Sequence, residues 1–214
     1  MSYLVSLVLE GRLAVVIGGG AVASRKVEDL LAAGAKVRVV APSLCDRLTA
    51  LAGQGRVVVQ PRPYRTEDLE GAFVVVAATD DEAVNAGVSQ DAVARSILVN
   101  VVDRPALCTF TLPAIVRRGA LTLAVATEGR CPALASVLRE ELEQRYGPEY
   151  AALLDLFSEL RRRMIALAWD GPRIRAALSR IYREGVLETM ASGDRALLHE
   201  FLQARLGSEF PIPQ

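Results

Sequence analysis

Residues 13–42 carry the pattern that most restricts the fold of this chain. A short apolar run, Leu13–Ile17, is typical of a strand buried on both faces. Three glycines follow it directly, and residues 21–33 then carry apolar side chains at a helical spacing. Gly34 marks the end of that helix, and Lys36–Ala41 is expected to form a second strand. Strand, glycine turn, helix and strand within about thirty residues predict a βαβ unit.

The glycines in this unit are spaced as Gly18-x-Gly20-x-x-Ala23. In such a turn, the first glycine permits the tight bend, the second lets a pyrophosphate approach the backbone, and the small third residue lets the helix lie against the strand. The amides of Ala21 and Val22 would then point at phosphate oxygens. A glycine turn that merely links strand to helix is the simpler alternative, but the surrounding βαβ pattern favours a dinucleotide site.

The end of the second predicted strand lacks the acidic residue that commonly holds the ribose hydroxyls of NAD. That place reads Pro42-Ser43. Ser43 could hydrogen-bond a ribose, whereas Arg47 could favour a 2′-phosphate. The residues alone therefore leave NAD and NADP both open.

The following residues repeat the alternation of buried strand and helix. Three further apolar strands are expected at Arg56–Gln60, Ala72–Ala77 and Ile97–Val102. Ser43 is expected to cap a helix before the third strand, and Asp81–Arg95 is expected to form a helix before the fifth. This order predicts an α/β fold with a parallel, doubly wound sheet of Rossmann type.

Polar residues follow the fourth and fifth predicted strands. Thr79 and Asp80 come after the fourth strand, and Asp103 comes after the fifth. Ligands of such sheets bind outside the carboxyl ends of the strands, so we expect these residues near the cofactor. A carboxylate there could take a proton from a substrate. From the spacing alone, a turn cap before Arg104-Pro105 is the simpler interpretation of Asp103.

The pattern changes after the fifth predicted strand. Thr109–Val116 and Ala120–Ala126 are expected to form a hairpin, and a hairpin this apolar needs a cover, for which a partner subunit is the natural candidate. Pro132 is expected to begin a helix. The remainder is expected to be helical, with an apolar stripe of core residues, a break at Asp170-Gly171-Pro172 and further helices over Pro172–Glu184 and Asp194–Leu206. That stripe consists of Tyr150, Leu153, Leu154, Phe157, Leu160, Met164 and Leu167.

Seven arginines lie between Ala151 and Gly185, against four acidic residues. Such residues usually form a solvent-exposed helix face, and the alternative is a surface that binds a polyanionic substrate.

Composition narrows the classes of partner. Basic and acidic residues balance at 25 each, so no net charge attracts the chain to nucleic acid or to a membrane surface. Every apolar run is interrupted before it reaches membrane-spanning length. The three cysteines show no paired spacing, which fits reduced thiols in a cytoplasmic protein. The single histidine, His199, excludes a His-rich metal site, and no metal is expected.

Three stretches follow one another over most of residues 10–146: GGGAVASRKVEDLLAAGAKVRVVAP, AATDDEAVN and VNVVDRPALCTFTLPAIVRRGALTLAVATEGRCPALASVLREELE. In this combination the chain resembles the precorrin-2 dehydrogenase/sirohydrochlorin ferrochelatase family, the dehydrogenase modules of siroheme synthases. No methyltransferase domain follows in the sequence, so the resemblance is to the stand-alone form.

The resemblance implies a protomer of three parts. These are an NAD-binding Rossmann domain (1–112), a small β-containing dimerisation segment (113–148) and an α-helical C-terminal domain (149–214). It also implies a homodimer and a small-molecule tetrapyrrole substrate. The implied reaction is NAD-dependent dehydrogenation of precorrin-2 to sirohydrochlorin in siroheme biosynthesis, and some members of the family also insert iron.

The family's catalytic aspartate sits in an N-V-V-D motif, which places that role on Asp103. The absence of an acidic residue after the second strand is usual in this family and favours NAD. Ala21 departs from the aspartate of several members. Together with the two residues after the fourth strand, the predicted cofactor-binding residues are Gly18, Gly20, Ala21, Val22, Pro42, Ser43, Thr79 and Asp80.

Two alternatives stay open. A nucleotide-sensing module without catalysis would share the fold and the glycine turn, but it would need neither Asp103 nor an arginine-bearing helical domain. An ordinary small-molecule dehydrogenase usually recruits His, Lys or Tyr as its acid or base, and no such residue stands at a suitable place.

Overall fold

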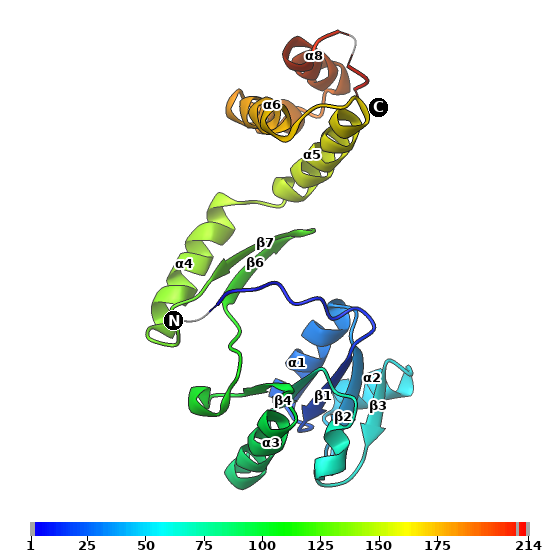
Figure 1. The fold of residues 1–214 in the computed structure, drawn as a ribbon, viewed down its shortest axis with the longest axis vertical. Coiled ribbons are helices and arrows are strands. Elements are labelled where there is room, and N and C mark those ends of the chain that lie inside the picture. The colour runs from blue at the N-terminus through cyan, green and yellow to red at the C-terminus, as the bar shows by residue number, and fades with distance from the viewer. Residues whose placement is uncertain (1–2, 209, 213–214) are drawn as a thin grey trace. The chain divides into compact units, whose positions relative to one another are not determined.

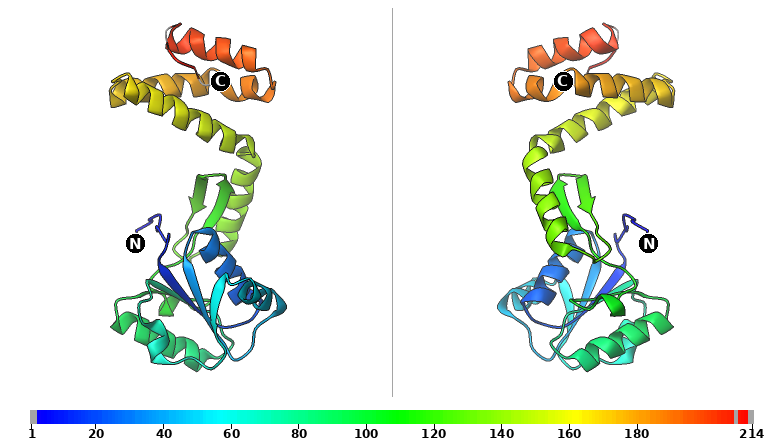
Figure 2. Two further views of the ribbon diagram at one scale, coloured as in Figure 1. Left: turned by 90° about the vertical axis from the view of Figure 1, so that its right-hand side faces the viewer. Right: turned by 90° about the vertical axis from the view of Figure 1, so that its left-hand side faces the viewer.

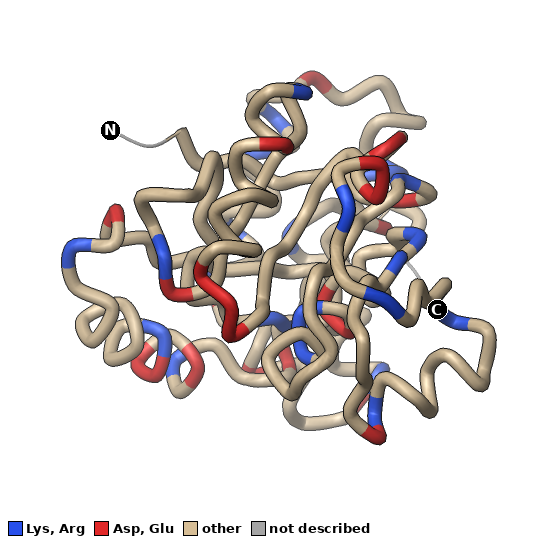
Figure 3. The backbone as a smooth tube through the Cα atoms, turned by 90° about the horizontal axis from the view of Figure 1, so that it is seen from below, with Lys and Arg blue, Asp and Glu red and all other residues tan. Residues whose placement is uncertain are grey.

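The computed structural model describes residues 3–208 and 210–212, and the chain divides into two compact units after Leu112 (Figure 1). The first unit is built on a sheet, and the second consists of a hairpin followed by helices (Figure 2). Basic and acidic positions are interspersed along the backbone (Figure 3).

The first unit contains a parallel sheet in the order β3-β2-β1-β4-β5, which confirms the predicted Rossmann-type arrangement. Each strand lies inside the range predicted for it. The strands are β1 (Leu13–Ile17), β2 (Lys36–Val40), β3 (Val57–Gln60), β4 (Val74–Ala77) and β5 (Leu98–Val101).

Helices cover both faces of this sheet, which is why its central strand is apolar throughout. Ala14 and Val16 of β1 pack into a core with α1 and α2, whereas Val15 and Ile17 pack into a second core with α3. The helical elements of the unit are α1 (Ala21–Ala32), α2 (Asp46–Gly53), η1 (Thr66–Leu69), α3 (Glu82–Ala94) and η2 (Pro105–Leu107), of which η1 and η2 are 3-10 helices.

The second unit begins with the hairpin β6 (Ala114–Arg118) and β7 (Leu121–Val125). The prediction that its first strand starts at Thr109 is wrong. The backbone N–H of Thr109 instead donates to the carbonyl oxygen of Val99 (2.9 Å), and the N–H of Val99 donates to Oγ1 of Thr109 (2.8 Å). These bonds tie the residue to β5 and keep it out of the hairpin.

Helix α4 (Pro132–Arg145) packs on the hairpin. Arg118 joins the two, since its Nε donates to the carbonyl oxygen of Tyr146 (2.7 Å) and its Nη2 to that of Glu143 (2.9 Å). These bonds satisfy carbonyls at the helix end that have no partner within the helix. Part of the cover that the hairpin needs therefore comes from its own chain.

The last helices enclose a separate core. Leu153, Leu160 and Met164 of the predicted stripe are buried there, but Leu167 is 49% exposed, because α5 ends one residue before it. The short α7 was not expected. The helices are α5 (Glu149–Ala166), α6 (Gly171–Arg183), α7 (Val186–Ala191) and α8 (Arg195–Leu206). Within the described ranges, no helix combines the length and apolarity needed to cross a membrane.

A buried carboxylate braces the first unit and generates a testable prediction. Asp68 is 4% exposed and accepts two hydrogen bonds from the guanidinium of Arg62 (2.6 and 2.8 Å) and one from the N–H of Arg65 (2.8 Å). Burial by itself would raise the pKa of Asp68, but these hydrogen bonds outweigh burial and lower the pKa below its usual range.

The stabilisation from Asp68 is therefore present above the pKa of an unfolded Asp, about 3.9, and is lost as the pH falls through the lower folded value. We expect Asp68→Asn to reduce the free energy of unfolding by about 2 kcal/mol at neutral pH and to flatten its decline below about pH 4. Denaturant titrations across pH will measure both effects, with the exposed Glu70→Gln as control. Identical acid slopes for the variant and the parent would contradict this.

Candidate functional site

The predicted site residues of the first unit gather at one edge of its sheet. Because all five strands are parallel, the turns after β1, β2, β4 and β5 lie at the same edge. The chain leaves β1 toward β2 and β3 on one side, whereas β4 and β5 lie on the other. Ligands of open α/β sheets bind at this change of direction, next to β1.

The three glycines after β1 have different structural roles. Gly18 has a φ of +128°, and a Cβ there would collide with the carbonyl oxygen of Ala78. A Cβ on Gly19 would collide with the carbonyl oxygen of Ser43, a constraint that the motif spacing did not reveal. A Cβ on Gly20 would meet nothing within 4 Å. The first two glycines are thus required by the fold, while the third leaves open space beside the turn.

That open space faces the first turn of α1. Gly20 is the N-cap of this helix and provides no side-chain hydrogen bond, so the amides of Ala21 and Val22 are left for another acceptor. Three other helices, α3, α6 and α8, have an Asp side chain at this position that accepts from their first amides. An uncapped helix N-terminus beside a side-chain-free turn fits a pyrophosphate.

The turn after β2 lies against the glycine turn. The N–H of Cys45 donates to the carbonyl oxygen of Gly19 (2.8 Å), and Cys45 rather than Ser43 is the N-cap of α2. This bond starts the helix two residues later than predicted and leaves Pro42 and Ser43 exposed in the turn. The nearby Arg47 forms an ion pair with Glu28 of α1.

The turn after β4 depends on a residue that the sequence analysis missed. Oγ1 of Thr79 donates to Oδ1 of Asn85 (2.8 Å), and Nδ2 of Asn85 donates back to the carbonyl oxygen of Thr79 (2.8 Å). Asp81 accepts from the first amides of α3, and Asp80 is exposed. The side chain of Thr79 therefore shapes the turn. The sequence signal that could have pointed to Asn85 is a polar residue flanked by apolar residues in the first turns of the predicted helix.

Asp103 lies exposed after β5 with a φ of +57°, a left-handed conformation that Asp and Asn adopt more readily than other side chains. The loop that carries it is closed by Cys108, whose Sγ accepts from the N–H of Val101 (3.2 Å). The same thiol lies 3.3 Å from the carbonyl oxygen of Val101 and 3.4 Å from that of Arg104, to either of which it can donate. The sequence analysis assigned no such role to Cys108.

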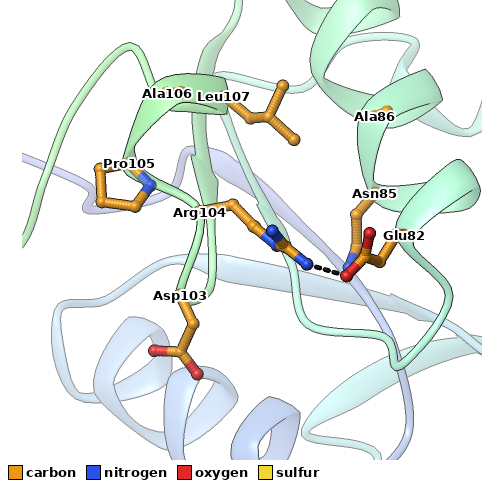
Figure 4. A pocket seen from close by; sticks show the side chains of 8 residues that line it. All are labelled: Glu82, Asn85, Ala86, Asp103, Arg104, Pro105, Ala106 and Leu107. Carbon is orange, nitrogen blue, oxygen red and sulfur yellow. Dashed lines mark ion pairs between the residues drawn. The ribbon is translucent and has the colours of Figure 1, made fainter.

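A cavity of about 430 Å³ opens beside this loop (Figure 4). Arg104 forms an ion pair with Glu82 across it, and the carboxylate of Asp103 points away from that pair. The cavity is lined by Glu82, Asn85, Ala86, Asp103, Arg104, Pro105, Ala106 and Leu107.

Known proteins resemble the chain in sequence and in structure. A family model described as "Putative NAD(P)-binding" matches residues 5–114. Siroheme synthases of Pseudomonas entomophila (strain L48) and Pseudomonas paraeruginosa (strain DSM 24068 / PA7) are each 42% identical to it, over 206 and 198 residues. These matches cover 96% and 92% of this chain but only 44% and 43% of the synthases, so the chain spans less than half the length of these relatives.

A solved structure, "SirC, precorrin-2 dehydrogenase", matches with a TM-score of 0.79 and 29% sequence identity. The superposition covers 96% of this chain and 99% of that one, so it includes both compact units.

The glycine turn generates the second prediction. We expect Gly20→Val to fold but to bind NAD at least about tenfold more weakly, about 1.4 kcal/mol, because its methyl groups occupy the open space beside α1. Calorimetric titration with NAD, and thermal melting, will separate the two effects. Gly53→Val is the control, since Gly53 ends α2 at the opposite edge of the sheet and also faces open space. Unchanged NAD affinity in Gly20→Val would refute this placement of the pyrophosphate.

Proposed function

We propose that this chain, which belongs to the NAD(P)-binding family, is an NAD-dependent precorrin-2 dehydrogenase of siroheme biosynthesis. The observation that carries the proposal is the extent of the match to SirC, which covers 99% of that chain. A nucleotide-sensing module would explain only the residues of the family model, 5–114. We assign dehydrogenation alone to this chain, because SirC, which it matches along its length, is a precorrin-2 dehydrogenase.

The turns at the sheet edge fit NAD. The glycine turn and the amides of Ala21 and Val22 would hold the pyrophosphate of NAD. Pro42 and Ser43 would contact the adenosine ribose, and the exposed Asp80 would contact a part of NAD farther from the glycine turn. We choose NAD over NADP because the absence of an acidic residue after β2, where Pro42 and Ser43 stand, is usual in the family that the sequence resembles. When bound, the nicotinamide supplies a hydride acceptor.

Asp103 is the residue that we assign as general base. Dehydrogenation removes a hydride and a proton from the substrate, and the proton needs an acceptor close to the reacting carbon. The carboxylate of Asp103 is exposed at the same sheet edge as the glycine turn, and it makes no contact with the neighbouring Arg104–Glu82 pair (Figure 4). When both reactants are bound at that edge, the reacting atoms are already close and oriented, which lowers the entropic cost of the transfer.

The third prediction tests this role. Asp103→Asn suits the left-handed backbone and keeps the size of the side chain, but it cannot accept the proton. NAD affinity should stay within about twofold, and the turnover of precorrin-2 at saturating NAD should fall by a factor on the order of 10² or more. The appearance of sirohydrochlorin absorption measures turnover.

Two outcomes would count against the proposal. Parent-like turnover by Asp103→Asn would return the residue to a turn cap. A parent protein that binds NAD but leaves precorrin-2 unchanged would instead favour the nucleotide-sensing alternative.

We also propose a homodimer, with the division 1–112, 113–148 and 149–214, in which the middle part forms the subunit contact. Two observations support it. The sheet of β6 and β7 has no third strand in the described part of the chain, so both of its outer edges are unpaired. Leu134 and Val137 of α4, which packs on this hairpin, are 49% and 51% exposed.

The fourth prediction concerns this contact. Sedimentation at micromolar concentration should give about twice the chain mass of 23.0 kDa. Val137→Asp should shift the distribution toward monomer, because a charge would be buried in the contact, whereas the neighbouring, exposed Ser136→Asp should leave it unchanged. A parent protein that sediments as a monomer would rule the dimer out.

A further inference from the structure

We propose that Arg104 forms a carboxylate-binding subsite beside Asp103 and that Glu82 occupies this subsite when substrate is absent. The ligand would be one of the carboxylate side chains of the tetrapyrrole. The inference rests on the proposed function, because it takes its substrate from there.

The geometry places this cation next to the proposed base. Arg104 directly follows Asp103, yet the two side chains point in different directions, and the guanidinium extends across the cavity to Glu82 (Figure 4). The backbone of Arg104 is held on both sides: its N–H donates to the carbonyl oxygen of Val101 (3.2 Å), and its own carbonyl accepts from the N–H of Leu107 (3.0 Å). The side chain thus reaches into the cavity from a fixed origin.

The Arg104–Glu82 pair is suited to exchange. The side chains are 52% and 74% exposed, and ion pairs in such surroundings contribute little to stability. A guanidinium offers five N–H donors and binds a carboxylate through two of them at once. A substrate carboxylate that is already held in the cavity by the rest of the molecule would therefore displace Glu82 readily.

Glu82 loses little when it is displaced. It is the first residue of α3, where the helix dipole favours a negative charge, and its side chain stays in water. The amides of that helix end keep their cap, because Oδ1 of Asp81 accepts from Ala83 (2.9 Å) and Val84 (3.1 Å).

Another pair in the same unit shows what a bracing ion pair looks like here. Asp68 is buried, and it accepts two bonds from Arg62 as well as one from the backbone N–H of Arg65. The Arg104–Glu82 pair has neither the burial nor the additional backbone bond. The contrast favours a role in binding for Arg104 over a role in stability.

Opposite effects of the two partners provide the test. With NAD saturating, Arg104→Gln should raise the KM for precorrin-2 about ten- to a hundredfold, the usual loss for a hydrogen bond to a charged group, and change kcat by less than about threefold. Glu82→Gln should lower the KM by up to about fivefold, because it removes the competitor. Arg95→Gln is the control, since Arg95 pairs with Asp91 near the other end of α3.

Equilibrium binding supplies a readout that does not depend on turnover. Titration of each NAD-free variant with sirohydrochlorin, followed by absorption, should give the same order of affinities as the KM values. Similar increases of KM in Arg104→Gln and Glu82→Gln would mean that the pair is a brace and would overturn the inference. So would an unchanged KM in Arg104→Gln.

The failure of the proposed function would look different. If the parent protein binds NAD but neither converts precorrin-2 nor binds sirohydrochlorin, both the proposed substrate and this subsite are refuted. If the parent protein is active and Arg104→Gln has the same KM for precorrin-2, only the subsite is refuted.

Discussion

Backbone packed directly on backbone determines the geometry of the proposed nucleotide site. The turn after β1 lies so close to the turns after β4 and β2 that Gly18 has no room for a Cβ beside Ala78, nor Gly19 beside Ser43. This packing brings three loops to one point of the sheet edge. It also leaves the first amides of α1 uncapped beside open space at Gly20. The proposed anion site is thus a consequence of how tightly the turns after the strands pack together.

The remaining functional groups are arranged around that point by local hydrogen bonds. Asn85 holds the turn after β4, and the thiol of Cys108 closes the loop after β5. The loop in turn presents Asp103 and Arg104 in different directions. The backbone of one loop thereby fixes the points from which the proposed proton acceptor and the proposed anion-binding group extend.

Much of the first unit could be predicted from its sequence, because its central strands β1 and β4 are buried on both faces and glycines mark the ends of α1 and α2. The five strands, their parallel order and the edge that carries the site all follow from those patterns. Pairwise contacts between distant residues could not be predicted. The bond from Cys45 to Gly19 moved the start of α2, and the bonds between Thr109 and Val99 removed a predicted strand segment. Neither contact leaves a periodic signal in the sequence.

The left-handed backbone at Asp103 restricts how this position can change over evolutionary time. Glutamate is the nearest chemical substitute for aspartate, yet it lacks the short side chain that makes such a φ inexpensive. Asparagine and glycine suit the backbone but bring no base. The substitutions that the fold tolerates best are therefore those that abolish the proposed chemistry. A lineage that drifts here would pass from enzyme to folded, nucleotide-binding pseudoenzyme in a single step.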